Sequence, residues 1–278
     1  MATEIRAHAK EDDLVTAARA GDRRALDALV TRYEPRVYRF SYRLTGNADD
    51  AAEVSQDTLL AMARSLRTFR GEASLTTWLY SVARRFALKR YRQRAKRLTR
   101  ETSIEDVESA AEPKLRSTAP TPEEVTVRLE RDAAINDALR QLSPTHREVL
   151  LLRDIEGLTA PEVSKVLGIG VRAVKSRLHR ARLNLRVTLA PLVGDEAVAP
   201  PKPGCRDIVS QFSQSLEGEL GPSTCAELEA HLERCPGCRA TCASLKKVLA
   251  VCRQAPPRDL PKALKRTLRE AIRQAARP

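Results

Sequence analysis

Residues 142–182 read LSPTHREVLLLRDIEGLTAPEVSKVLGIGVRAVKSRLHRAR, and this stretch predicts a helix-turn-helix. Ser143-Pro144 places an N-cap hydroxyl before a proline at the first helical position. Thr159 and Glu162 fit a capping box for a second helix, and 168–170, Gly-Ile-Gly, supply a tight turn. A third helix follows directly after that turn.

The third helix of this stretch has one apolar side and one basic side. Val174, Leu178 and Ala181 fall at helical spacing on the side expected to face a core. The other side carries five candidate DNA-reading residues: Arg172, Lys175, Ser176, His179 and Arg180. Arg and Lys read guanine edges in the major groove, and Ser and His can donate or accept there. The pattern predicts duplex DNA binding, and the alternative is a surface helix that is merely basic.

The composition agrees with a nucleic-acid partner. The chain has 278 residues with 49 Lys and Arg against 36 Asp and Glu, a net charge of +13 that favours a polyanion. The 42% apolar content suffices for packed cores, and the scarcity of alternating β-branched runs predicts an all-α fold. With no long apolar run and no leader-like start, we expect no membrane span and a cytoplasmic location.

An N-terminal module at 11–97 is predicted to contain four helices. Asn47 is a candidate cap for a helix over 48–66, and a long helix is expected from about Leu75. That helix runs into 82–100, which holds nine Lys and Arg and no acid. A surface that binds single-stranded DNA needs aromatic rings beside basic side chains, because rings stack on unpaired bases and cations neutralise phosphates. The residues expected to be exposed there are Tyr80, Arg84 and Tyr91.

All six cysteines lie in a module predicted at 205–255. Residues 231–238, HLERCPGC, place His231 and Cys235 one helical turn apart, and a Pro-Gly turn brings Cys238 back beside them. These are three ligands of a tetrahedral zinc site. Cys205 is the expected fourth ligand; the alternatives are Cys242 and Cys225. The surplus thiols also suit copper or cadmium as a sensed ion, or an oxidation sensor.

Linkers are predicted at 98–130 and at the Pro-rich 191–204, on either side of a DNA-binding domain at 131–190. After the cysteine module, 258–278 is predicted to be an amphipathic helix with one apolar stripe. The stripe consists of Leu260, Leu264, Leu268 and Ile272.

The order of these modules resembles that of an extracytoplasmic-function (ECF) sigma-70 family RNA polymerase sigma factor. Residues 50–58, DAAEVSQDT, look like the family's polymerase-clamp helix, and 69–80, FRGEASLTTWLY, look like its −10-reading loop and helix. Residues 142–182 look like its −35-reading module. The arrangement around 205–238 resembles a zinc-binding anti-sigma domain, here fused to the C-terminal side.

The resemblance implies partners and roles for particular residues. Core RNA polymerase would be bound through its β′ clamp and β flap, with Asp50, Glu53, Gln56 and Asp57 on the clamp side. The −10 element would be bound, with one base flipped out of the stack, by Arg70, Ser74, Trp78, Tyr80, Arg84 and Arg85. RNA synthesis would belong to the polymerase, so we expect this chain not to be an enzyme.

The C-terminal part suggests regulation within the chain. In anti-sigma domains a helix comparable to 258–278 packs on the sigma surface, so the tail is expected to contact the sigma modules and act in cis. A polymerase-independent helix-turn-helix repressor is one alternative, although it leaves the N-terminal module without a role. A thiol oxidoreductase using Cys235 and Cys238 is another, but it would need a thioredoxin-like βαβ context.

Overall fold

The computed structural model describes residues 2–101, 122–194, 205, 208–254, 260 and 262–275. Side chains are described for 11–94, 130–194, 205, 208–254, 260 and 265–272. Much of the two predicted linkers, at 102–121 and 195–204, and the side chain of Leu264 therefore lie outside the described residues.

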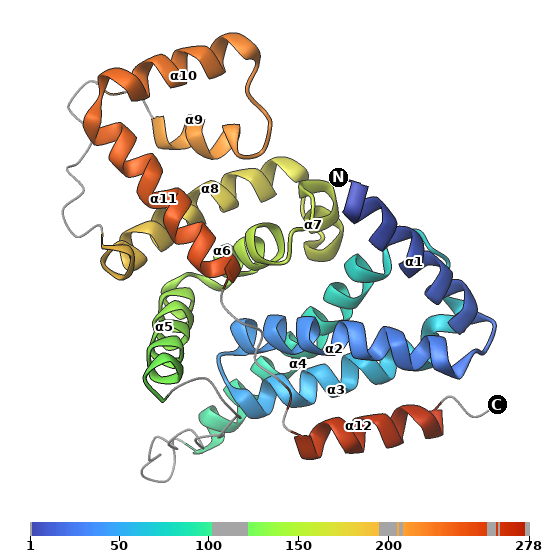
Figure 1. Cartoon of the computed structure of the whole chain (residues 1–278). Coiled ribbons are helices and arrows are strands. Elements are labelled where there is room, and N and C mark those ends of the chain that lie inside the picture. The colour runs from blue at the N-terminus through green and yellow to red at the C-terminus, as the bar shows by residue number, and fades with distance from the viewer. Residues whose placement is uncertain are drawn as a thin grey trace. The chain divides into compact units, whose positions relative to one another are not determined.

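The described residues contain helices and no strand, so the all-α prediction is confirmed (Figure 1). The chain divides into two compact units, Met1–Pro120 with Pro257–Pro278, and Thr121–Pro256. The first unit holds α1 (Ala2–Arg19), α2 (Arg23–Thr45), α3 (Ala48–Ser65), α4 (Leu75–Glu101) and α12 (Lys262–Ala275). The second holds α5 (Pro122–Gln141), α6 (Pro144–Leu150), α7 (Ala160–Leu167), α8 (Val171–Leu189), α9 (Ile208–Ser215), α10 (Pro222–Arg234) and α11 (Pro236–Gln254).

In the first unit α2, α3 and α4 pack on one another around a core of large apolar side chains. The Asn47 side chain accepts a hydrogen bond from the Asp50 amide at 2.9 Å, which confirms the predicted cap of α3. Tyr33 joins three helices, because its hydroxyl bonds Glu11 of α1 and lies 3.0 Å from Thr76 Oγ1 of α4. Burial raises the pKa of Tyr33, so the phenol stays a neutral donor.

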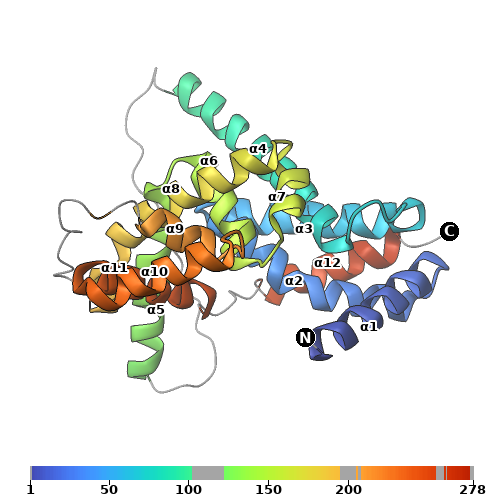
Figure 2. The ribbon, with the colours of Figure 1, turned by 90° about the horizontal axis from the view of Figure 1, so that it is seen from above.

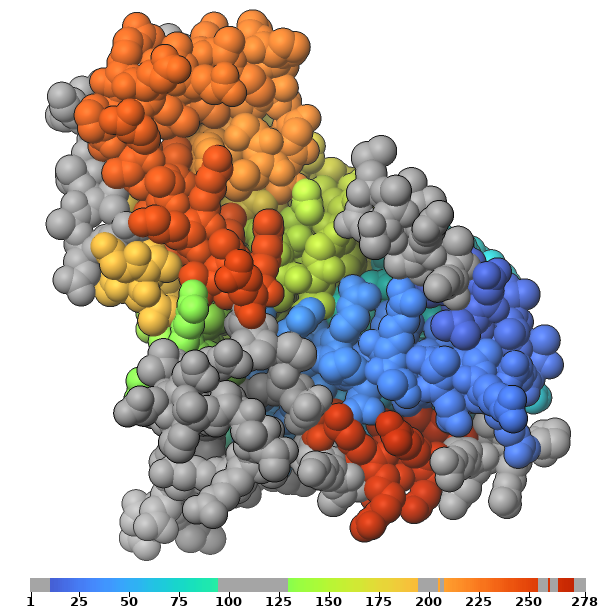
Figure 3. Space-filling view, in the orientation of Figure 1, coloured from blue at the N-terminus to red at the C-terminus, as the bar shows by residue number. Residues whose placement is uncertain are grey.

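Helix α12 packs along α3 within the same unit (Figure 2). Its apolar residues Leu268 and Ile272 are buried, as is Leu260 just before the helix. Lys265 Nζ lies 3.0 Å from Glu34 Oε1 of α2, where the carboxylate is buried. In the space-filling view α12 lies against the surface formed by the early helices of this unit (Figure 3).

The second unit contains the helix-turn-helix over α6, α7 and α8. The capping box of α7 is confirmed: the Thr159 amide donates to Glu162 at 2.8 Å and the Glu162 amide to Thr159 Oγ1 at 3.4 Å. Gly168 ends α7 in the left-handed conformation, with φ 66°, which glycine adopts without a Cβ clash. Val174, Leu178 and Ala181 of α8 are buried, as predicted.

One predicted cap is wrong. Ser143 precedes α6 and Pro144 is its first residue, but the Ser143 side chain makes no hydrogen bond to the helix amides. Its hydroxyl lies 3.3 Å from Thr145 Oγ1 instead. Arg147 of α6 stabilises the connection between α5 and α6, because its guanidinium donates to carbonyls at the end of α5, including Leu139 O at 2.7 Å.

Candidate functional site

Four ligand-bearing side chains meet where α10 ends and α11 begins. His231 lies in the last turn of α10, Cys235 separates the helices, and Cys238 lies in the first turn of α11. Cys205, which precedes α9 in the chain, joins them. The ligand atoms of all four residues lie within 4.8 Å of one another, and the sulfurs of Cys205 and Cys235 are 3.8 Å apart.

This donor set fits a zinc ion. In a tetrahedral site with Zn–S bonds of about 2.3 Å, two sulfurs lie about 3.8 Å apart. His231 Nε2 is buried and has no hydrogen-bond partner among the described residues, so this nitrogen is available to a metal ion. Three thiols and one imidazole in this arrangement are typical of a structural zinc site.

Metal binding at this cluster would be coupled to proton release. The backbone N–H of Cys238 bonds the Cys235 sulfur and lowers the pKa of that thiol. Burial raises the pKa of the neighbouring Cys238 thiol, and the sulfur of Cys205 adds to this shift. A bound cation would stabilise the Cys238 thiolate, which burial disfavours, because a cysteine binds metal as the thiolate.

The surplus cysteines lie outside this cluster. Of the two alternatives for the fourth ligand, Cys225 is half-buried with its sulfur 3.8 Å from Leu220 O, and Cys242 is buried on α11. Burial raises the pKa of Cys242 to about 11. Cys252 is also buried further along α11. The structure thus brings Cys205, rather than either alternative, to the other three ligand atoms.

The predicted DNA-reading side of α8 is largely open to solvent. Arg172, Ser176 and Arg180 are exposed, while Lys175 and His179 are half-exposed. Lys175 differs from the others because its Nζ lies 2.9 Å from Glu219 Oε1, in the turn that follows α9. A residue of the cysteine module therefore reaches the basic side of α8.

A buried ionic network, which the sequence patterns did not reveal, joins the cysteine module to the helix-turn-helix. Arg182 of α8 forms two hydrogen bonds with Asp154, of 2.8 and 2.6 Å, and both side chains are 1% exposed. Arg182 also donates to Ser213 O and Ser213 Oγ in α9 and to Glu217 Oε1 at 2.6 Å. Burial lowers the pKa of Arg182, but the hydrogen bonds and charges of Asp154 and Glu217 outweigh burial and raise it, so the guanidinium is charged.

Two further arginines complete this network. Arg153 donates to Glu217 Oε2 at 2.6 Å, and Arg253 of α11 donates to Asp154 O at 2.8 Å. The partners are separated by 28 to 99 residues along the chain, so no local periodicity could have identified them.

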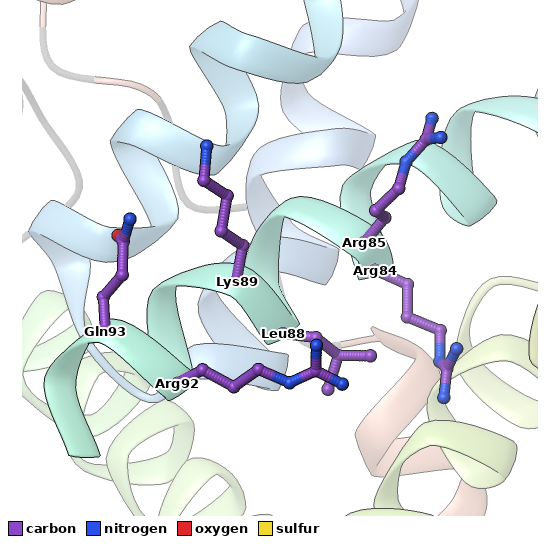
Figure 4. Close-up of a pocket in the computed structure, with 6 residues that line it drawn as sticks. All are labelled: Arg84, Arg85, Leu88, Lys89, Arg92 and Gln93. Atoms are coloured by element: carbon purple, nitrogen blue, oxygen red, sulfur yellow. The ribbon is translucent and has the colours of Figure 1, made fainter. Parts of the chain in front are cut away.

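The basic part of α4 forms the second candidate DNA surface. A hollow of about 530 Å³ is lined by Arg84, Arg85, Leu88, Lys89, Arg92 and Gln93. The side chains of Arg85, Lys89 and Gln93 leave one side of the helix and those of Arg84, Leu88 and Arg92 another (Figure 4). Tyr91 is 70% exposed, so a ring stands beside these cations as expected.

The expectation that Tyr80 is exposed is wrong. Its side chain is 2% exposed and packs on Phe40, with ring centroids 4.9 Å apart. Tyr80 follows the helical spacing of the core, so this ring stabilises α4 against α2 and is not available to stack on a base. Of the other predicted −10 residues, Arg70, Ser74 and Arg85 are exposed, while Trp78 is half-buried with its ring edge-on to Phe69. The Ser74 hydroxyl also accepts from the Thr77 amide at 3.2 Å and so caps α4.

The four predicted polymerase-binding residues lie along α3. Asp50 lies 3.5 Å from Arg94, and Glu53 pairs with Arg90, so these two acids of α3 are paired with arginines near the end of α4. Glu53 is exposed, and Gln56 and Asp57 are half-exposed. These positions share a helix with the contact surface of α12.

Three family models match successive parts of the chain. Sigma-70 region 2 matches residues 29–97, and Sigma-70, region 4 matches residues 132–185. The model described as "Putative zinc-finger" matches residues 205–239, which include all four ligands of the cluster.

Curated relatives cover the two sigma regions. The RNA polymerase sigma-H factor of Pseudomonas aeruginosa is 30% identical over 185 residues, which is 66% of this chain and 96% of the relative. The ECF RNA polymerase sigma factor SigE of Mycolicibacterium smegmatis is 34% identical over 173 residues, 61% of this chain and 65% of the relative. The sigma factor RpoE in complex with the anti-sigma factor NepR from Bartonella quintana aligns with 22% identity and a TM-score of 0.47, over 59% of this chain and 95% of that one.

No helix in the described part of the chain is both long and apolar enough to span a membrane.

Proposed function

Because this chain belongs to the ECF group of sigma-70 family RNA polymerase sigma factors, with a zinc-finger module of the anti-sigma type following the sigma regions, we propose that it directs core polymerase to promoters under control of that module in cis. The observation that carries the regulatory part is the packing of α12 along α3. Helix α3 bears the residues assigned to the polymerase clamp, so a helix that covers part of α3 competes with polymerase.

The DNA-binding roles follow from chemistry and exposure. Arg172, Lys175, Ser176, His179 and Arg180 would contact the −35 element in the major groove. Arg70, Ser74, Trp78, Arg84 and Arg85 would hold the opened −10 element, with Tyr91 as the exposed ring. Tyr80 supports this surface from the core.

The cysteine module would be held together by zinc on Cys205, His231, Cys235 and Cys238. Bound zinc would cross-link the start of the module to the junction of α10 and α11, and so supply part of the folding free energy of a small domain. Ser213 and Glu217 hold the module on α8 through Arg182, and α12 packs on α3. RNA synthesis belongs to the polymerase, so we assign no catalytic residue here.

Pull-down of core polymerase tests the α3 assignment. The full chain should retain polymerase, and the double substitution Gln56→Ala with Asp57→Ala should reduce retention by at least about tenfold, as for the loss of interface contacts of 1–2 kcal/mol. Asp49→Ala is the matched control, because Asp49 is an exposed acid of the same helix. Equal retention by both variants would remove α3 from the polymerase interface.

The same assay tests occlusion by α12. Leu268→Ala with Ile272→Ala removes buried contacts of α12 and should increase polymerase retention. Arg266→Ala with Arg269→Ala alters exposed residues of α12 and should leave retention unchanged. A decrease with the apolar double variant would mean that α12 supports polymerase binding and that the proposed inhibition is wrong.

A further inference from the structure

Two acids lie in the turn that connects α9 to α10. Glu217 accepts from Arg182 and Arg153, each at 2.6 Å, and its side chain is 6% exposed. Gly218 has φ 67° and turns the chain, and Glu219 then reaches Lys175 at 2.9 Å. We call residues 217–219 the acidic turn. It places two carboxylates on basic residues of the helix assigned to −35 recognition.

The geometry points to the acidic turn as an internal competitor of promoter DNA for α8. This inference rests on the proposed function, because it requires that α8 binds the −35 element. Duplex binding needs cations free to meet phosphates or guanine edges. When the turn is docked, a carboxylate holds the Lys175 ammonium and repels any phosphate that approaches it.

The two acids contribute differently. Glu217 is buried in the network with Arg182 and Asp154, where removal of one charge leaves its partners buried and unpaired. Glu219 and Lys175 have side chains that are 24% and 40% exposed, and an exposed pair adds little stability. Glu217 therefore fixes the position of the turn, and Glu219 supplies the competing charge.

Docking of the turn reduces DNA affinity without removing it. Arg172, Ser176 and Arg180 remain exposed on the same side of α8 while Lys175 is occupied. The full cationic surface becomes available only when the module leaves α8. The signal that releases the module and the affinity for the −35 element are coupled through this turn.

Glu219→Gln in the full chain removes the charge that competes with DNA while leaving Glu217 to hold the acidic turn on α8. The probe is the −35 duplex of a promoter that the full chain selects with core polymerase from a random-sequence pool. The variant should bind this duplex roughly 3- to 10-fold more tightly at low salt, with a salt dependence steeper by about one phosphate contact. Its unfolding midpoint should stay within about 2 °C of the parent.

Two controls complete the test. Glu227→Gln removes one charge from an exposed position of α10 in the same module and should leave the affinity unchanged. In a Lys175→Gln background, Glu219→Gln should also have no effect, because the pair acts as a unit. If Glu219→Gln binds no more tightly than Glu227→Gln while the parent still binds the duplex and directs polymerase, the competition is refuted and the sigma function stands. If no promoter is selected at all, the sigma function fails and the competition falls with it.

Discussion

Arg182 has a structural role that its place on the helix assigned to −35 recognition conceals. It is 1% exposed and is surrounded by Asp154, Glu217 and the backbone of Ser213. A buried guanidinium is tolerated only when its donors are matched by acceptors. Here three hydrogen bonds go to carboxylates, one to the Ser213 carbonyl and one to the Ser213 hydroxyl. The residue thus joins two parts of the second unit.

Arg182→Ala should destabilise the protein by about 3–5 kcal/mol, because Asp154 and Glu217 remain buried without their partner. Urea unfolding monitored by circular dichroism measures this loss. Arg180→Ala, two residues earlier and exposed, should change the free energy of unfolding by less than about 0.5 kcal/mol. Equal stabilities of the two variants would show that the network contributes nothing to folding.

Cys242 is expected to be a slow thiol. Its pKa is raised to about 11 by burial, so at pH 8 the reactive thiolate is a small fraction of the population. With iodoacetamide it should react on the order of 10²-fold more slowly than an ordinary exposed cysteine of pKa about 8.5. Peptide mass spectrometry after timed labelling gives the rate. Labelling of Cys242 as fast as the half-exposed Cys225 would exclude this environment.

At the scale of the element, α4 combines a buried side and a side that we propose binds DNA. Tyr91→Ala should weaken binding of forked promoter DNA by the polymerase complex about tenfold, since one stacked base contributes about 1–3 kcal/mol. Tyr80→Phe, in the core, should leave binding unchanged because the ring is retained. Anisotropy with labelled forked DNA provides the measurement. An unchanged affinity for Tyr91→Ala would show that the exposed ring does not meet DNA.

Helix α9 connects the cluster of Cys205, His231, Cys235 and Cys238 to the ionic network. Cys205 lies just before this helix, Ser213 lies near its end, and Glu217 follows in the turn after it. Chelation of zinc should therefore release α9 first, with a loss of amide-exchange protection in α9 and α10 of about tenfold or more. Helices α2 and α3 should keep their protection. Uniform protection before and after chelation would mean that no metal stabilises the module.

The sequence predicted the elements better than their contacts. Asn47 and the Thr159–Glu162 box gave helix starts because capping is local. The prediction of a Ser143 cap was wrong, because Ser143 stands at the N-cap position of α6 but its hydroxyl does not reach the first amides of the helix. The prediction that Tyr80 is exposed was wrong, because the sequence of a basic helix does not show whether an aromatic residue on it is buried or exposed.

The candidate sites also differ in how far the sequence predicted them. The cluster of His231, Cys235 and Cys238 could be predicted because its ligands are neighbours along the chain. The pairs of Arg182 with Glu217 and of Lys175 with Glu219 could not, because they depend on how the cysteine module packs on α8. Such contacts depend on tertiary packing, which no periodicity encodes.

At the scale of the whole molecule, the C-terminal part contacts both predicted DNA-binding modules. Its helices α9 and α11 pack on α8 in one unit, and α12 packs on α3 in the other. Because all these segments belong to one chain, each contact operates at an effective concentration of order mM, so modest interactions suffice. Release of the metal-binding module would weaken the hold on α8, and detachment of α12 would expose α3.

Transcription in vitro tests the central claim most directly. The full chain with core polymerase is given a pool of genomic fragments, with and without a zinc chelator, and the 5′ ends of the transcripts are mapped. Initiation should occur at defined start points that share −35 and −10 elements, with more transcript after chelation or with the double variant Leu268→Ala with Ile272→Ala. Absence of any sequence-specific start under all of these conditions would contradict the sigma function. Identical output from the parent with and without metal and from the double variant would contradict control in cis.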